Sequence, residues 1–188
     1  MQAVTDRLDG AATVLLCAPS AGRDDDAICE QLLCAGATDG REVLWISYSH
    51  SSTACLDGIP SEGTERAVLA VGGNDDETGQ DVTVDAVSNK SDLTALGIKL
   101  SQFLSTSDGA ITVCFDSVTT MLEHVDLQTA YEFLHTITRQ CYAEGARLHF
   151  HLDPAAHDDT TVATITSLCD ALVVFDPEPT VRVRPSGE

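Results

Sequence analysis

Short, continuously apolar segments of this chain alternate with longer segments in which apolar residues recur every three or four positions. Runs of the first kind are typical of strands buried on both faces of a parallel sheet. They are found at Thr13–Ala18, Glu42–Ser47, Ala110–Asp116, Arg147–Asp153 and Ala171–Asp176. The alternation predicts an α/β fold with a mostly parallel sheet flanked by helices on both faces.

Amphipathic stripes with a period near 3.6 residues predict the longer helices. One stripe runs from Leu93 to Leu104, with Ser91 as its expected N-cap. Another runs from Leu127 to Cys141, and Gly145 is placed to end it. A third spans residues 162–168.

The remaining apolar segments bear on domain organisation. Two of them, residues 67–71 and 82–87, flank the acidic stretch GGNDDETGQ, which predicts a surface turn or hairpin. No internal repeat is evident. We therefore expect residues 1–188 to form one domain with its core at about 13–176, while 177–188 form an edge strand or a loose tail.

The charge of the chain is strongly negative. Asp and Glu total 30 against 10 Lys and Arg, which gives a formal net charge of −20. Such a chain repels itself in dilute buffer, whereas near 1 M salt the screening length falls to about 3 Å. Because the acidic residues are spread along the chain, we expect adaptation to a salt-rich cytoplasm, as in a halophilic archaeon; an acidic interaction surface is the alternative. Without Lys/Arg clusters, nucleic acid is not an expected partner.

Membrane and disulfide signals are weak. The sequence has no apolar run of about 18 residues and no basic leader before an apolar core, so we expect a cytoplasmic protein that does not enter membranes. Seven cysteines without a C-x-x-C pair do not indicate a disulfide framework. Most lie in apolar runs, among them Cys17, Cys114 and Cys169, where a free thiol behaves as a small apolar side chain.

The segment after the first strand occupies the place of a phosphate-binding loop. The pattern G-x-x-x-x-G-K-[ST] falls on residues 17–24, CAPSAGRD, and only Gly22 matches it. Cys17 replaces the first glycine, Arg23 the lysine, and Asp24 the hydroxyl residue that would hold Mg²⁺. Two further aspartates follow. At 5 Å and an effective dielectric of 20, each contact between a carboxylate and a phosphate costs roughly 3 kcal/mol.

Three interpretations of the aspartate triplet at 24–26 stay open. The triplet caps the following helix and complements its dipole, or it belongs to a degraded pocket that still holds ATP with Mg²⁺, or it binds a metal or a basic partner. We favour the first and expect no cofactor. If a nucleotide does bind, Gly22, Arg23, Asp24 and Asp116 are the residues expected to hold it.

The second half of the chain carries a family resemblance. The stretches ITVCFDSVTTMLEHVDLQTAYEFLHTITRQ and GARLHFHLDPAAHDDTTVATITSLCDALVVF strongly resemble a haloarchaeal family of unassigned function with a RecA/KaiC-like core, sometimes labelled HTR-like. The resemblance covers residues 13–175. It implies that Asp116 stands where an ATPase orients Mg²⁺ and water; capping of the next helix is the alternative role of this residue.

The resemblance also implies that catalysis is lost. Active KaiC-like proteins place two glutamates just after the second strand as the catalytic base, and here Ser49 and His50 stand in their place. Both the phosphate cradle and the base are therefore altered. We expect a catalytically silent module of signalling or regulation that binds another protein or a sister copy. The alternative is a weak or divergent NTPase that uses Arg23 and Asp116.

Two further kinds of site are less favoured. His149 and His151 lie two apart on a predicted strand, hence on one face, with Asp153 and His157 nearby. They could share a zinc ion with a ligand from the loop, but LDPAAHDD also suits a turn that leads into a capped helix, and we expect no metal site. A phosphoacceptor role for Asp116 is disfavoured because both lysines lie before or within a helix.

Overall fold

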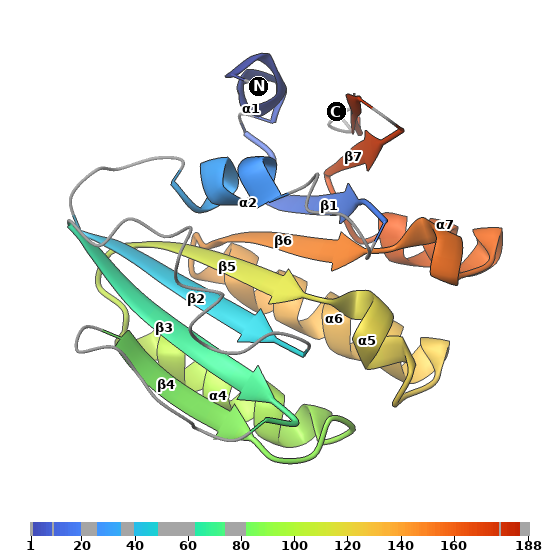
Figure 1. Cartoon of the computed structure of the whole chain (residues 1–188). Coiled ribbons are helices and arrows are strands. Elements are labelled where there is room, and N and C mark those ends of the chain that lie inside the picture. Colours follow the sequence, from blue (N-terminus) through green and yellow to red (C-terminus); the bar gives the residue numbers. More distant parts are fainter. Residues whose placement is uncertain are drawn as a thin grey trace.

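A computed structural model describes residues 2–8, 10–19, 26–34, 40–48, 63–73, 82–176 and 178–184. Its strands form one sheet in the order β4-β3-β2-β5-β6-β1-β7-β8, in which β8 alone is antiparallel to its neighbour (Figure 1). The strands are β1 (Thr13–Cys17), β2 (Arg41–Ser47), β3 (Thr64–Val71), β4 (Val82–Val87), β5 (Ala110–Asp116), β6 (Arg147–Leu152), β7 (Ala171–Phe175) and β8 (Pro179–Val183). The helices are α1 (Gln2–Arg7), α2 (Asp26–Leu33), α4 (Leu93–Thr106), α5 (Val118–Leu122), α6 (Leu127–Ala143) and α7 (Asp159–Thr166), with a 3₁₀ turn, η1 (Pro154–Ala156).

The predicted α/β class is confirmed, with helices on both faces of a mostly parallel sheet. On one face, α4, α5, α6 and α7 cover a large apolar cluster, and Figure 1 shows α4 and α6 behind the strands. On the other face, α1 and α2 cover a smaller cluster above β1, β5 and β7. Within the segment expected to be an edge strand or a loose tail, residues Pro179–Val183 form β8, which pairs with β7 at the end of the sheet.

The predicted hairpin between β3 and β4 is wrong. The two strands are parallel, with Arg66 opposite Val82 and Val71 opposite Val87. A tight hairpin turn joins antiparallel strands, so it cannot join these two. Residues 74–81 of this acidic connection lie outside the described residues. Turn-forming residues marked the interruption correctly but carried no information on strand direction.

The helices α4 and α6 begin where the sequence predicts, but the cap of α4 differs, and α7 runs from Asp159 to Thr166 and not over residues 162–168. Gly145 ends α6 with a φ of 68°, the left-handed conformation that glycine adopts without strain. The N-cap of α4, however, is Asp92 and not Ser91: the Asp92 carboxylate accepts a hydrogen bond from the Ala95 N–H at 2.9 Å. The Ser91 hydroxyl instead donates to the side chain of Asn89. Among the described residues, no helix is both long and apolar enough to cross a membrane.

Candidate functional site

Parallel α/β sheets bind ligands at the carboxyl ends of their strands, so the end of β1 is the first place to look for a site. The predicted nucleotide residues Gly22, Arg23 and Asp24 lie outside the described residues, as do Ser49 and His50. Of the predicted set, the structure describes Asp116. It also describes both ends of the interrupted loop, which are the end of β1 and the start of α2.

Asp116 is the last residue of β5 and is half-buried. Its carbonyl oxygen accepts a hydrogen bond from the Tyr48 N–H at 2.7 Å, which joins the ends of β2 and β5. The helix that follows is capped by Ser117, whose hydroxyl accepts from the Thr120 N–H. The capping alternative for Asp116 is therefore wrong, and its position at the strand end is the one expected from the resemblance.

At the end of β1 the structure describes residues 17–19, none of which is basic. Cys17 is 2% exposed, and burial, reinforced by the charge of Asp153, raises its pKa to about 12, so its side chain is a neutral thiol. The next N–H group, that of Ala18, donates to the carbonyl oxygen of Leu152 at 3.1 Å. This N–H therefore extends the β1–β6 pairing and is not presented to a ligand.

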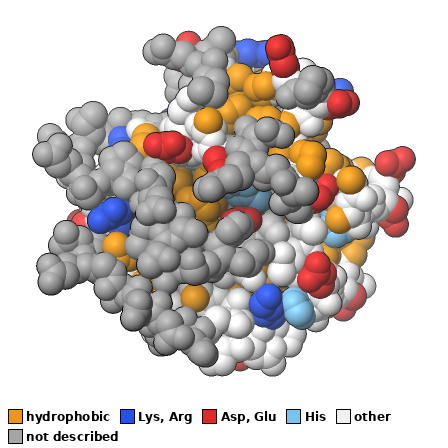
Figure 2. Space-filling model, in the orientation of Figure 1, with side chains coloured by type: hydrophobic (Ala, Val, Ile, Leu, Met, Phe, Trp, Pro, Cys, Tyr) orange, Lys and Arg blue, Asp and Glu red, His pale blue; other side chains and the backbone are white. Residues whose placement is uncertain are grey.

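The charges described beside β1 at this edge are negative, whereas Lys90, which follows β4 at the far end of the sheet, is basic. Asp153 follows β6, Asp176 follows β7 and Asp26 opens α2. Among the described residues that directly follow β1, β5, β6 and β7, none is Lys or Arg. Figure 2 looks onto a face of the sheet, and among its coloured residues acidic side chains are seen at several places, including the right side, toward which the strands of Figure 1 point. In the described part of the chain, acidic residues therefore flank the end of β1.

A second group of chemically active side chains lies between α2 and the sheet. Cys114 on β5 is directly opposite His149 on β6, and His151 projects from the same face of β6 two residues later. Cys29 reaches them from the buried side of α2. The side-chain ligand atoms of these four residues all lie within 4.8 Å of one another, and all four residues are buried. We call them the Cys/His cluster.

The contacts inside the Cys/His cluster are short. The Sγ atom of Cys29 lies 3.8 Å from Sγ of Cys114 and 3.2 Å from Nε2 of His149, and neither cysteine is in a disulfide. The ring centres of His149 and His151 are 5.5 Å apart. The hydrogen bond from Cys114 and the charges of the two histidines hold the pKa of Cys29 well below its ordinary value, against the opposing effect of burial.

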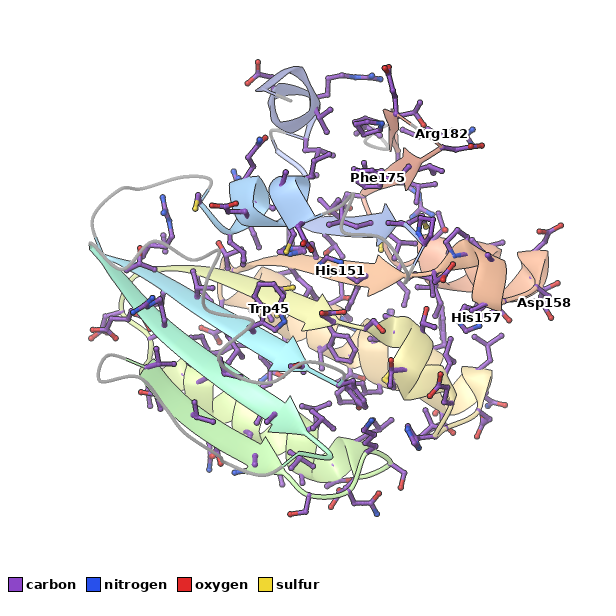
Figure 3. All side chains as sticks on the ribbon, in the orientation of Figure 1. Trp45, His151, His157, Asp158, Phe175 and Arg182 are labelled. Atoms are coloured by element: carbon purple, nitrogen blue, oxygen red, sulfur yellow. The ribbon has the colours of Figure 1, made fainter. Side chains whose placement is uncertain are left out.

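The structure supports only part of the histidine grouping that the sequence suggested. His149 and His151 do come together, but Asp153 caps η1 through a hydrogen bond from the Ala155 N–H. His157 lies beyond the strand ends, where its Nε2 is 3.2 Å from the Thr119 hydroxyl (Figure 3). The two cysteines of the cluster were missed because strand register and helix placement, which set their positions, are not readable from spacing alone.

Comparison with solved structures identifies the fold as RecA-like. A protein from Pyrococcus horikoshii OT3 aligns with a TM-score of 0.62 at 8% identity, over 97% of this chain and 93% of that one. The flagellar accessory protein FlaH from Methanocaldococcus jannaschii aligns with a TM-score of 0.52 at 10% identity, over 87% and 70% of the two chains. An ATPase from the type III secretion system of pathogenic bacteria aligns with a TM-score of 0.52 at 11% identity, over 88% of this chain but only 51% of the ATPase. This chain therefore spans about half of that ATPase.

Comparisons of sequence give a family without an activity. No curated protein matches the chain. A family model, in contrast, matches residues 11–175, which is most of the sequence. The chain therefore belongs to that family, which is described as a family of unknown function (DUF7504).

Proposed function

We propose that this chain is a non-catalytic RecA-like module that acts by binding another protein or a second copy of itself. The observation that carries the proposal is the chemistry of the carboxyl edge. Where a RecA-like ATPase needs a glycine-rich, positively charged loop, β1 ends in the neutral thiol of Cys17. The Ala18 N–H is engaged with β6, and the neighbouring strands are followed by aspartates.

Electrostatics make this edge a poor place for a nucleotide. One phosphate within 5 Å of one carboxylate costs roughly 3 kcal/mol at an effective dielectric of 20. Between Cys17 and Ala27 the sequence offers a single basic residue, Arg23, to offset three consecutive aspartates. Repulsion therefore exceeds attraction at the place where a polyphosphate would be held.

The regulatory part of the proposal is supported by the names of two structurally similar proteins. Two of the structurally similar proteins are named as a flagellar accessory protein and as an ATPase of a secretion system. A fold used in such settings suits a module that works through protein contacts, although the fold alone does not define a function. We place the module in signalling or regulation, in line with the family resemblance of the sequence.

Nucleotide binding is the direct test. Equilibrium binding of a fluorescent ATP analogue would be measured in molar KCl, with and without Mg²⁺. We expect no binding in the micromolar range under either condition. Micromolar binding that Asp116→Ala abolishes would overturn the proposal, provided that Asp108→Ala, at the opposite end of β5, leaves that binding intact.

A weak or divergent NTPase is the second candidate, and the position of Asp116 favours it. This residue ends β5, which is separated from β1 by the single strand β6, so a nucleotide seated at the end of β1 would face it. Release of phosphate from ATP that depends on both Asp116 and Arg23 would establish this candidate. No release above the rate of an Asp116→Ala, Arg23→Ala double variant would support the non-catalytic module.

Adaptation to salt is a further part of the proposal. With a net charge of −20, self-repulsion is largely screened at 1 M KCl but extends over about 10 Å at 0.1 M. We expect the protein to be folded and to associate with its partner or with itself in molar KCl, and to lose structure in dilute buffer. Circular dichroism and sedimentation velocity along a KCl series would measure both. Full stability at low salt would contradict this part.

A further inference from the structure

The proposed function leaves the Cys/His cluster unexplained. Two thiols and two imidazoles converge in a place that is otherwise apolar, lined by residues such as Val14, Leu16 and Ile28. Burying polar side chains costs free energy unless they find matching partners. These four side chains come from three separate elements, α2, β5 and β6, so their convergence is a property of the tertiary fold.

We propose that the Cys/His cluster binds one zinc ion as a closed, structural metal site. Two sulfur and two nitrogen donors are the ligand set that zinc prefers in proteins, and tetrahedral S₂N₂ sites are diagnostic of it. Four protein ligands leave no open position for water or substrate. The site therefore stabilises the fold and has no catalytic role, and it goes beyond the proposed function. It also reverses the expectation, drawn from the sequence, that the chain has no metal site.

The distances suit a tetrahedral zinc ion. Two thiolates at about 2.3 Å from such an ion lie about 3.8 Å apart, and a thiolate and an imidazole nitrogen lie about 3.5 Å apart. The separation of the Cys29 and Cys114 sulfurs is 3.8 Å, and that of the Cys29 sulfur and the His149 nitrogen is 3.2 Å. Adjustments of a few tenths of an ångström to about one ångström would bring all four ligands to bonding distance, since none of their separations exceeds 4.8 Å.

The charges also balance. Two thiolates and two neutral imidazoles carry a total charge of −2, which one Zn²⁺ cancels, so the loaded site is neutral where it is buried. The ion would link α2 to β5 and β6. This link lies near the carboxyl edge of the sheet, where an ATPase of this fold contacts its nucleotide.

Metal analysis of the full-length protein tests the site. The protein would be purified without a polyhistidine tag in molar KCl, and its zinc content measured by mass spectrometry. We expect about one zinc ion per chain in the wild type, and at least a tenfold lower content in Cys29→Ala and Cys114→Ala. Cys141→Ala is the matched control, because Cys141 is 1% exposed on the opposite face of the sheet. Zinc retained by Cys29→Ala and Cys114→Ala would overturn the proposal.

A second measurement avoids the risk that the variants fail to fold. Wild-type protein would be stripped with a chelator and titrated with Co²⁺, whose thiolate complexes absorb strongly in tetrahedral sites. Trp45, labelled in Figure 3, is the single tryptophan and lies opposite Cys114 in the β2–β5 pairing. Adjacent strands are about 4.8 Å apart, so bound Co²⁺ should quench its fluorescence.

The outcomes of the titration are decisive. Saturation at one Co²⁺ per chain, with thiolate-to-cobalt absorption, quenching of Trp45 and displacement by Zn²⁺, supports the site. Absence of zinc from the purified protein together with absence of cobalt uptake overturns it. The cluster is then a metal-free group of two thiols and two imidazoles. Neither outcome depends on ATP binding, so this proposal and the proposed function can fail separately.

Discussion

Alternate residues of β5 and β6 meet two different environments on the two faces of one sheet. On the face covered by α4 and α6, Val113, Phe115 and Phe150 are fully buried, and the two phenylalanine rings pack edge to face with centres 5.9 Å apart. On the face covered by α2, Cys114 and His149 are buried just as deeply. Side chains on the two faces are therefore buried to a similar extent, but those on one face are apolar and these two on the other carry a thiol and an imidazole.

The difference shows what each face needs in order to be stable. Burial alone is enough for apolar side chains to stabilise the folded state. Helix α6, with 17 residues, supplies a long surface that buries them. Thiols and imidazoles gain only if they find partners, and α2 has 8 residues with which to cover them. The first face is stabilised by a large buried apolar area, whereas the second combines a smaller apolar cluster with the specific contacts of the Cys/His cluster.

The largest expected effect is on the face covered by α4 and α6, which we call the apolar face. Phe150→Ala removes a fully buried ring that packs against Phe115, and such truncations cost about 3–5 kcal/mol in free energy of unfolding. Urea unfolding in molar KCl would measure this loss. The same loss is expected in the presence and absence of a chelator, because the ring lies on the face away from the Cys/His cluster. A loss below about 1 kcal/mol would show that this face is not the one that holds the fold.

Removal of metal should have the next largest effect and should act on the other face. With free zinc at 100 to 1,000 times its Kd, binding adds about 2.7–4.1 kcal/mol to the stability of the folded state. A chelator should therefore lower the stability of the wild type by up to this amount, measured as a shift of the urea midpoint. In Cys29→Ala the chelator should have no effect. An equal shift in both proteins would mean that the chelator acts elsewhere.

A pair of matched variants separates the two faces further. Cys114 and Cys141 are both buried, on opposite faces, so loss of either sulfur should cost about 1 kcal/mol when a chelator is present. With zinc present, Cys114→Ala should lose additional stability, whereas Cys141→Ala should not. Equal costs with and without zinc would remove the distinction between the faces.

Most of the fold could be predicted from the sequence because its local signals agree with its tertiary structure. The central strands are buried on both faces, so they appear as continuous apolar runs, and β5 was predicted with its observed bounds. The direction of β4 could not be predicted, because an acidic, glycine-containing connection suits a hairpin and a crossover equally well. Helix α1 was not predicted, since its six residues are too few to show a periodic pattern.

The candidate sites were less predictable for a different reason. The position of Asp116 at a strand end is a local property and was found from the sequence. The Cys/His cluster depends on the pairing of Cys114 with His149 and on the placement of Cys29 above them, which are tertiary properties. Its one local signal was the presence of ligand-forming residues inside runs that are otherwise apolar.

A smaller effect tests the corrected cap of α4, a helix of the apolar face. Asp92→Ala removes the side chain that accepts from the Ala95 N–H and should cost about 1 kcal/mol in free energy of unfolding. Ser91→Ala should change stability by less than about 0.5 kcal/mol, because its hydroxyl bonds only to the exposed side chain of Asn89. Urea unfolding measures both, and a larger loss for Ser91→Ala would restore Ser91 as the cap.

The smallest expected effect is a loss of stability in acid, caused by protonation of Asp126, the N-cap of α6. The backbone N–H of Thr129, with its hydroxyl, donates to the Asp126 carboxylate at the start of α6 and lowers its pKa. A depressed carboxylate pKa stabilises the folded state fully above the unfolded value of about 3.9, and this stabilisation disappears as the pH falls through the folded pKa. Asp126→Asn can still cap the helix but does not titrate, so its stability should fall less steeply than that of the wild type between pH 5 and about pH 3. Unfolding would be followed in the presence of a chelator, so that loss of metal in acid does not contribute. If the free energy of unfolding fell in parallel with pH for the two proteins, the cap of α6 would hold its hydrogen bonds equally well with a protonated carboxyl group. The charge of Asp126 would then contribute nothing to the stability of the apolar face.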